Sequence, residues 1–114
     1  MFDQRTSGRR LVRWRTAIIS TDGDPTIIPG HVTEVSAKGL ALFCDKQLYP
    51  NKVYRIVLQI PDPLHVGVTY VEVYGKPTYS SLVGPMGQFR TGMKLTEISN
   101  DYKTRIDQML RNSG

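Results

Sequence analysis

The first fifteen residues are rich in arginine, a side chain that can bind anionic and planar ligands. Five are arginines and only Asp3 is acidic, so this segment carries +4 of the chain's formal charge of +5. A guanidinium group binds phosphate or the O6 and N7 edge of guanine through two parallel hydrogen bonds, and it stacks on purine rings. The pattern favours an anionic, planar partner, with a solvated, partly ordered terminus as the alternative. The arginines are Arg5, Arg9, Arg10, Arg13 and Arg15.

Two of these arginines, Arg9 and Arg13, are four residues apart where the first predicted strand begins. They can converge on one ligand if the preceding loop folds back. Further along, residues 34–39 predict a turn between two strands that offers the Glu34 carboxylate, the Ser36 hydroxyl and a glycine. The carboxylate can accept hydrogen bonds from N1–H and the 2-amino group of guanine. Gly39 permits a positive φ or a close approach of another backbone.

The sequence does not indicate catalysis or metal binding. His31, His65 and Cys44 have no metal-ligand spacing to one another, and a single cysteine cannot form an internal disulfide. The chain has no glycine-rich nucleotide loop of the known types and no nucleophile elbow. We therefore expect a protein that is not an enzyme and has no metal site or cofactor.

The residues that must position these groups alternate between apolar and polar, which is the period of β-strands. In the first such stretch, Trp14 alternates with Val12 and Ile18, so we expect it in the core. Turn signals such as Asp22-Gly23-Asp24-Pro25 separate the stretches. Seven strands are predicted, over residues 11–20, 26–35, 40–43, 53–60, 66–74, 77–83 and 88–95.

Only the C-terminal segment has a helical period, with one stripe of Tyr102, Ile106, Met109 and Leu110. Ser99 or Asn100 can cap its start, and the helix should cover an open end of the sheet or rest on a partner. The fold class is therefore all-β and mainly antiparallel, a six- to seven-stranded β-barrel with a short C-terminal α-helix. We expect one domain over residues 1–114, with a flexible basic arm (1–10), a barrel (11–96) and a helix (99–112).

The overall composition fits a soluble globular chain, with 39% hydrophobic and 22% charged residues. No apolar run approaches the roughly 18 residues that span a bilayer. The N-terminal Met-Phe-Asp-Gln-Arg lacks the apolar stretch of a signal peptide. A cytoplasmic protein is the expectation.

Together, the two motifs resemble the signature of the PilZ family, whose members are bacterial β-barrel receptors for cyclic di-GMP. That signature consists of two motifs. The first is an N-terminal Arg-x-x-x-Arg, and the second, further along the chain, is Asp/Asn-x-Ser-x-x-Gly. The resemblance extends to residues 39–42, which are similar to the family's following strand, and to residues 92–99, which are similar to its last strand and the lead-in to its helix. It covers the chain from about Arg5 to Leu110.

The resemblance implies that cyclic di-GMP is the ligand. Arg9 and Arg13 would contact its guanine and phosphate, Arg10 would be a third contact, and Ser36 and Gly39 match the second motif directly. Glu34 departs from the family's Asp or Asn, and its longer side chain would present its oxygens from further out. Weaker contacts are expected from Arg5, Lys38 and Tyr79.

The predicted function is that of a cyclic di-GMP receptor or adaptor, in which the ligand rearranges the N-terminal arm and a downstream protein reads the change. Such receptors act in second-messenger signalling, including motility and biofilm formation. One alternative is a PilZ-like adaptor that does not bind the ligand and acts by protein contact, which the Glu34 departure favours. The other is a small basic β-barrel that binds nucleic acid, with Tyr54, Tyr70 or Tyr74 as stacking surfaces.

Overall fold

The computed structural model describes residues 8–23, 26–62, 67–85 and 87–112, with side chains described as far as Met109. It contains six strands and one helix within these ranges. The elements are β1 (Arg10–Ser20), β2 (Ile27–Val35), β3 (Gly39–Cys44), β4 (Tyr54–Pro61), β5 (Val68–Val83), β6 (Gln88–Ile98) and α1 (Asn100–Asn112).

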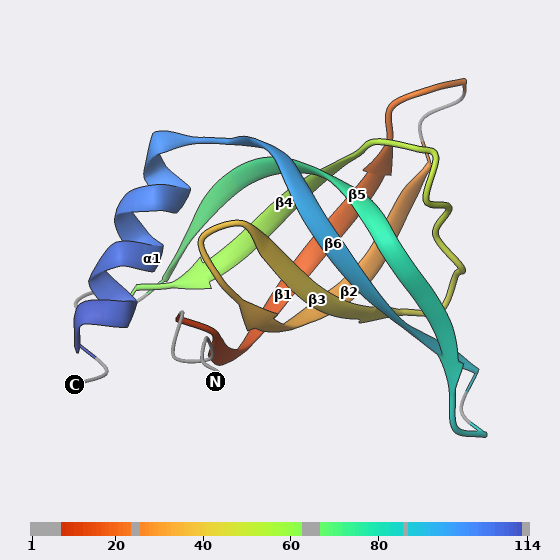
Figure 1. The fold of residues 1–114 in the computed structure, drawn as a ribbon, viewed down its shortest axis with the longest axis horizontal. Coiled ribbons are helices and arrows are strands. Elements are labelled where there is room, and N and C mark those ends of the chain that lie inside the picture. Colours follow the sequence, from red (N-terminus) through yellow and green to blue (C-terminus); the bar gives the residue numbers. More distant parts are fainter. Residues whose placement is uncertain (1–7, 24–25, 63–66, 86, 113–114) are drawn as a thin grey trace.

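The six strands close into a barrel in the order β1-β2-β3-β6-β5-β4, with β4 pairing back onto β1 (Figure 1). Every neighbouring pair is antiparallel. The predicted fold class, an antiparallel β-barrel with a short C-terminal helix, is confirmed with six strands.

Inward-facing residues alternate along each strand and fill the barrel. In β1 the buried positions are Trp14, Thr16 and Ile18, while Arg13 and Arg15 face solvent. Trp14 is 6% exposed, so its predicted place in the core is confirmed, and Val12 packs against the core partly buried. Thr16 is tolerated inside because its hydroxyl donates to the Val57 carbonyl at 2.8 Å.

Helix α1 lies across one end of the barrel, as predicted (Figure 1). Tyr102 and Ile106 are buried in the barrel core, and Met109 packs against it partly buried. Ser99 is the cap, since its Oγ accepts a hydrogen bond from the Tyr102 amide at 3.2 Å. The side chain of Leu110, the fourth residue of the predicted stripe, lies outside the described residues.

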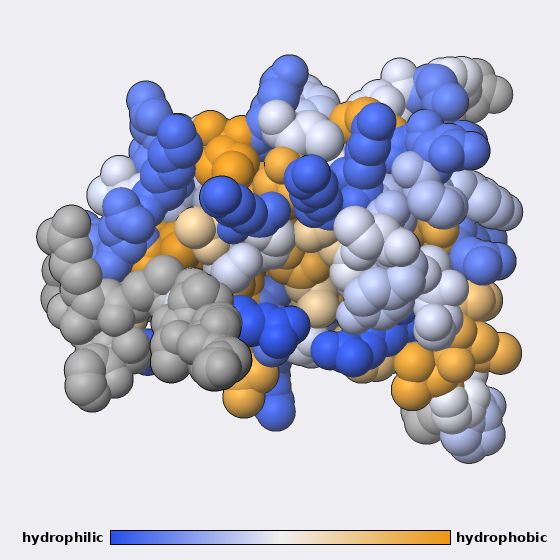
Figure 2. Space-filling model, in the orientation of Figure 1, coloured by the Kyte–Doolittle hydropathy of each residue, from blue (hydrophilic) through white to orange (hydrophobic). Residues whose placement is uncertain are grey.

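The opposite end of the molecule carries the projecting β5–β6 hairpin (Figure 1). Leu82 and Val83 near its tip are 62% and 41% exposed, and Figure 2 shows hydrophobic surface in this region. Among the described residues, no helix is long and apolar enough to cross a membrane.

The prediction of two separate strands at 66–74 and 77–83 is wrong, because one strand, β5, runs through both. By local rules Gly75 and Pro77 favour a break at this point. Instead, the pairing with β6 shifts register between Tyr74 and Gly75 and again between Pro77 and Tyr79. These irregularities absorb the two residues and let the ladder continue. Strand β6 also extends three residues beyond its predicted end, to Ile98.

The hydroxyl of Tyr102 should contribute to the stability of the fold. It is buried and donates to the Ser36 carbonyl at 2.7 Å, so Tyr102→Phe leaves that carbonyl without this donor. We expect the free energy of unfolding to fall by about 1 kcal/mol, measured by urea denaturation. The matched control is Tyr70→Phe, because Tyr70 is 66% exposed on the barrel exterior. Equal denaturation midpoints for the two variants would contradict the role of this bond.

Candidate functional site

Both sequence motifs meet at a hollow of about 200 Å³ near the α1 end of the barrel. It forms where β1 begins, where β2 passes into β3, and where β5 pairs with β6. Four of the predicted motif residues line it, and so does Tyr79, which was predicted as a weaker contact. The predicted residues brought together here are Arg9, Glu34, Ser36, Gly39 and Tyr79.

An ion pair joins the two motifs across this hollow. The Arg9 Nη2 lies 3.2 Å from the Glu34 Oε1, and the two side chains are 63% and 22% exposed. An ion pair this accessible to water is worth at most about 1 kcal/mol. The two groups with the chemistry to bind a guanine nucleotide therefore hold each other weakly, and each can be drawn away by a better partner.

The turn from Ser36 to Gly39 is fixed by its own hydrogen bonds. The Ser36 amide donates to the Gly39 carbonyl at 2.9 Å, and the Gly39 amide donates to the Ser36 Oγ at 3.2 Å. Gly39 is required by close approach and not by a positive φ, since a Cβ there would lie 2.7 Å from the Met93 carbonyl oxygen. The second motif is thus a rigid wall of the hollow.

Tyr79 lies over Gly92, its partner on β6. A Cβ at Gly92 would overlap the tyrosine ring, with Cε1 and Cδ1 as its nearest neighbours. Only glycine lets the ring lie this close to the backbone. The ring remains 42% exposed and lines the hollow, so it can serve as a stacking surface for a flat ligand.

The predicted third contact, Arg10, faces away from the hollow. Successive side chains of a strand point to opposite sides, and the Arg10 Nη1 donates to the Met109 carbonyl of α1 at 3.1 Å. That carbonyl belongs to the last turn of helix α1. The first motif therefore contacts the hollow through Arg9 and helix α1 through Arg10.

The second motif is joined to the same helix by the Tyr102 hydroxyl, which donates to the Ser36 carbonyl at 2.7 Å. Burial raises the pKa of Tyr102 well above its usual range, so the hydroxyl keeps its proton and remains a donor. Helix α1 is consequently tied to both motif segments, one bond to each.

The other predicted contacts lie elsewhere. Arg13 is exposed on β1, within the register shift between Leu11 and Trp14, and does not line the hollow. Lys38 is exposed in the turn, and its carbonyl accepts from the Leu95 amide at 2.9 Å. Arg5, and likewise His65, lie outside the described residues.

Sequence reasoning missed the floor of the hollow, which includes Thr78, Gly92 and Met93. Thr78 and Met93 carry no chemical signal by themselves. Gly92 was assigned only to the last strand, and its role depends on facing Tyr79 across the sheet. No spacing along the chain reveals that pairing. Within the described part of the chain, no three potential metal ligands lie together.

The comparisons with known proteins bear on the fold. No family model matches the sequence, and no curated protein matches it. Among solved structures, the inhibitor of motility MotI/DgrA of Bacillus subtilis is similar, with a TM-score of 0.73 at 13% sequence identity. The match covers 98% of this chain and 52% of that one, so this chain spans about half its length. At this identity the likeness is one of fold: the chain has a PilZ-like β-barrel.

Proposed function

We propose that the protein is a receptor for cyclic di-GMP that passes its signal to a downstream protein, without being an enzyme. The observation that carries the proposal is the convergence of Arg9, Glu34, Ser36 and Gly39 around one hollow, beside the exposed ring of Tyr79. Arginine, carboxylate and hydroxyl are the groups that a guanine base and a phosphodiester require.

The Glu34 carboxylate would accept from N1–H and the 2-amino group of a guanine. Arg9, released from Glu34, would bind the O6 and N7 edge or a phosphate, and Tyr79 would stack on a base. The opposite charges of Arg9 and Glu34 offset each other in their ion pair. Since the pair is solvent-accessible, breaking it costs little compared with the charge-assisted bonds that replace it.

Arg10 and Arg13 would join the ligand by rearrangement of the beginning of β1. A phosphate competes well with the Met109 carbonyl for the Arg10 guanidinium, because a charged acceptor forms the stronger hydrogen bond. Binding would then break one of the two hydrogen bonds that join α1 to the motif segments. The changed arm and helix would form the surface that a downstream cytoplasmic protein reads.

The alternative is a PilZ-like adaptor that does not bind cyclic di-GMP. The Arg9–Glu34 ion pair favours it, because the residue that departs from the family pattern occupies the motif arginine. The similar solved protein is described as an inhibitor of motility, which fits an output by protein contact in either case.

The first prediction concerns the arginines. Isothermal titration of the wild type with cyclic di-GMP should give saturable heat. Arg9→Ala and Arg13→Ala should each weaken the affinity about 10- to 100-fold, the loss of one charge-assisted contact of roughly 1.5–3 kcal/mol. Arg105→Ala on α1 is the matched control and should bind like the wild type. No heat from the wild type, or unchanged affinity in both motif variants, would refute the receptor proposal.

The second prediction concerns Glu34. In Glu34→Asp, the shorter carboxylate reaches Arg9 less well and can bond its own backbone two residues on. We expect cyclic di-GMP to bind about three- to tenfold tighter, the range of one modest hydrogen bond. Glu72→Asp, which alters the Arg55–Glu72 pair on the barrel wall, serves as the control. If neither the wild type nor Glu34→Asp binds, the ligand-independent adaptor is supported.

The third prediction concerns helix α1. Saturating cyclic di-GMP should speed hydrogen exchange of the amides in its last turn, because Arg10 leaves the Met109 carbonyl. Arg10→Ala should exchange faster there without ligand and should show no further increase when ligand is added. Ligand binding that leaves the last turn of the wild type unchanged would show that α1 takes no part in the response.

A further inference from the structure

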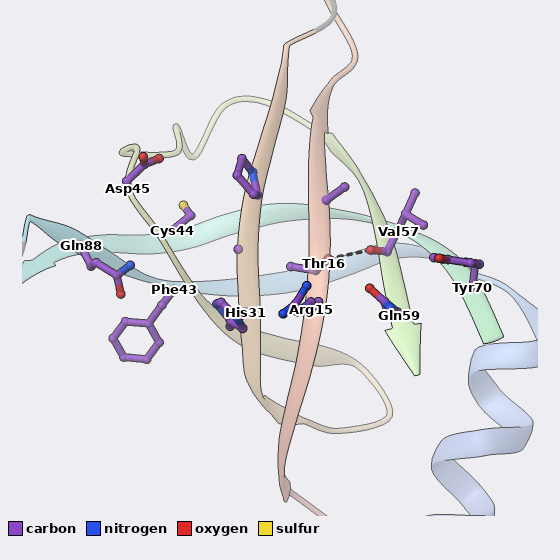
Figure 3. A pocket seen from close by; sticks show the side chains of 13 residues that line it. Arg15, Thr16, His31, Phe43, Cys44, Asp45, Val57, Gln59, Tyr70 and Gln88 are labelled. Atoms are coloured by element: carbon purple, nitrogen blue, oxygen red, sulfur yellow. Dashed lines mark hydrogen bonds between the residues drawn. The ribbon is translucent and has the colours of Figure 1, made fainter. Parts of the chain in front are cut away.

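A second hollow, of about 520 Å³, lies on the outer wall of the barrel (Figure 3). It shares no residue with the first hollow, which is lined by the two sequence motifs and is called the motif site below. Its lining comes from the outward faces of several strands, with Arg15 of β1, His31 of β2 and Gln59 of β4 lying side by side near its middle (Figure 3).

The strand register places this lining in one row. Arg15 pairs with His31 on one side and with Gln59 on the other. The row continues in one direction through Phe43 and in the other to Tyr70. With strands about 4.8 Å apart, it runs for roughly 19 Å across five strands. Arg90 extends it by one more strand, since it pairs with Phe43.

A second row, parallel to the first, is apolar and small. Ala17 of β1 lies between Pro29 of β2 and Val57 of β4, and all three line the hollow. The next pair in the same direction is Ile19 with Ile27, and Ile27 is 67% exposed. The wall therefore presents an aliphatic strip beside a polar row.

The polar row carries two guanidinium groups, Arg15 in the lining of the hollow and Arg90 beyond it. Arg15 is exposed, and within the described residues neither it nor Arg90 forms an ion pair. The acidic residue in the lining is Asp45, at the edge beside Cys44 (Figure 3). The Thr16 hydroxyl is already used by the Val57 carbonyl. A partner thus meets exposed guanidinium donors next to aliphatic surface.

We propose that this wall is a docking surface for an acidic segment of another protein, one that places apolar side chains on the aliphatic strip and a carboxylate on Arg15. Charge complementarity carries the choice of an acidic partner. The closed barrel also limits the binding mode, because β1, β2 and β4 each have both edges paired. The segment cannot add as another strand and is bound through side chains.

The strip argues for a protein segment and against nucleic acid. Single-stranded nucleic acid binds on successive aromatic platforms. Here the two rings, Phe43 and Tyr70, stand at opposite ends of the polar row, and the parallel strip beside it is aliphatic. Aliphatic floor with a charged border is the anatomy of a protein interface. The inference does not depend on cyclic di-GMP binding.

The test begins with a displayed library of random 12-residue peptides selected on the immobilised full-length protein. We expect enrichment of peptides that combine Asp or Glu with Leu, Ile, Val or Phe. A synthetic, fluorescein-labelled winner should lose at least tenfold in affinity with Arg15→Glu, measured by anisotropy. Arg105→Glu, an equal charge reversal on α1, should not change the affinity. Chemical-shift mapping should place the peptide at Ala17, His31 and Val57.

Three results would overturn the proposal: enrichment without acidic peptides, binding that Arg15→Glu leaves intact, or shifts confined to the motif site. A labelled 12-nucleotide oligo-dT is measured in parallel. If the oligo-dT binds the wild type but not Arg15→Glu, and no acidic peptide shows this behaviour, the wall is a nucleic-acid site. Because Arg15 is exposed, thermal unfolding of Arg15→Glu should match the wild type, which separates lost binding from lost fold.

Discussion

The closure of β4 onto β1 is the constraint on which the other features depend. Because β1 pairs with β2 on one side and, from Arg15 to Ser20, with β4 on the other, alternate residues from Trp14 onward point inward or outward. Trp14 and Ile18 build the core, while Arg15 and Ala17 appear on the outer wall. Where the strand begins, Arg10 bonds to α1, and Arg9, just before it, lines the hollow. One strand therefore serves the core, the motif site, the tie to α1 and the docking wall.

The motif site combines a rigid wall with weakly held charges. The Ser36–Gly39 turn is bonded internally and pressed against β6, so it is already shaped before any ligand arrives. The Arg9–Glu34 pair is exposed and exchangeable. Such a division lets a ligand replace one interaction without remodelling the barrel, and it directs any change toward the beginning of β1 and toward α1, which are joined by Arg10.

Much of the fold follows from the sequence, because inward and outward alternation and turn residues are local signals. The strands other than β5, the capping of α1 near Ser99 and the burial of Trp14 are of this kind. The continuity of β5 is not, since Gly75 and Pro77 end a strand by local rules and only the bulged pairing with β6 carries the ladder through. That Arg9 and Glu34 belong to one site was predicted from the resemblance to a family signature, not from local rules. The Arg10 bond to Met109 joins residues 99 positions apart, and Tyr79 over Gly92 depends on cross-strand register, so neither has a signal along the chain.

The burial of Trp14 also gives the protein an internal optical reporter. It is the sole tryptophan in the chain, and it stands at the end of the register shift that separates Arg13 from the regular part of β1. Indole emission responds to polarity and to nearby quenching groups. A rearrangement that begins at Arg9 and travels along β1 reaches Trp14 before it reaches the rest of the barrel. The native chain can therefore be followed by its own fluorescence in stopped-flow experiments, without an added dye.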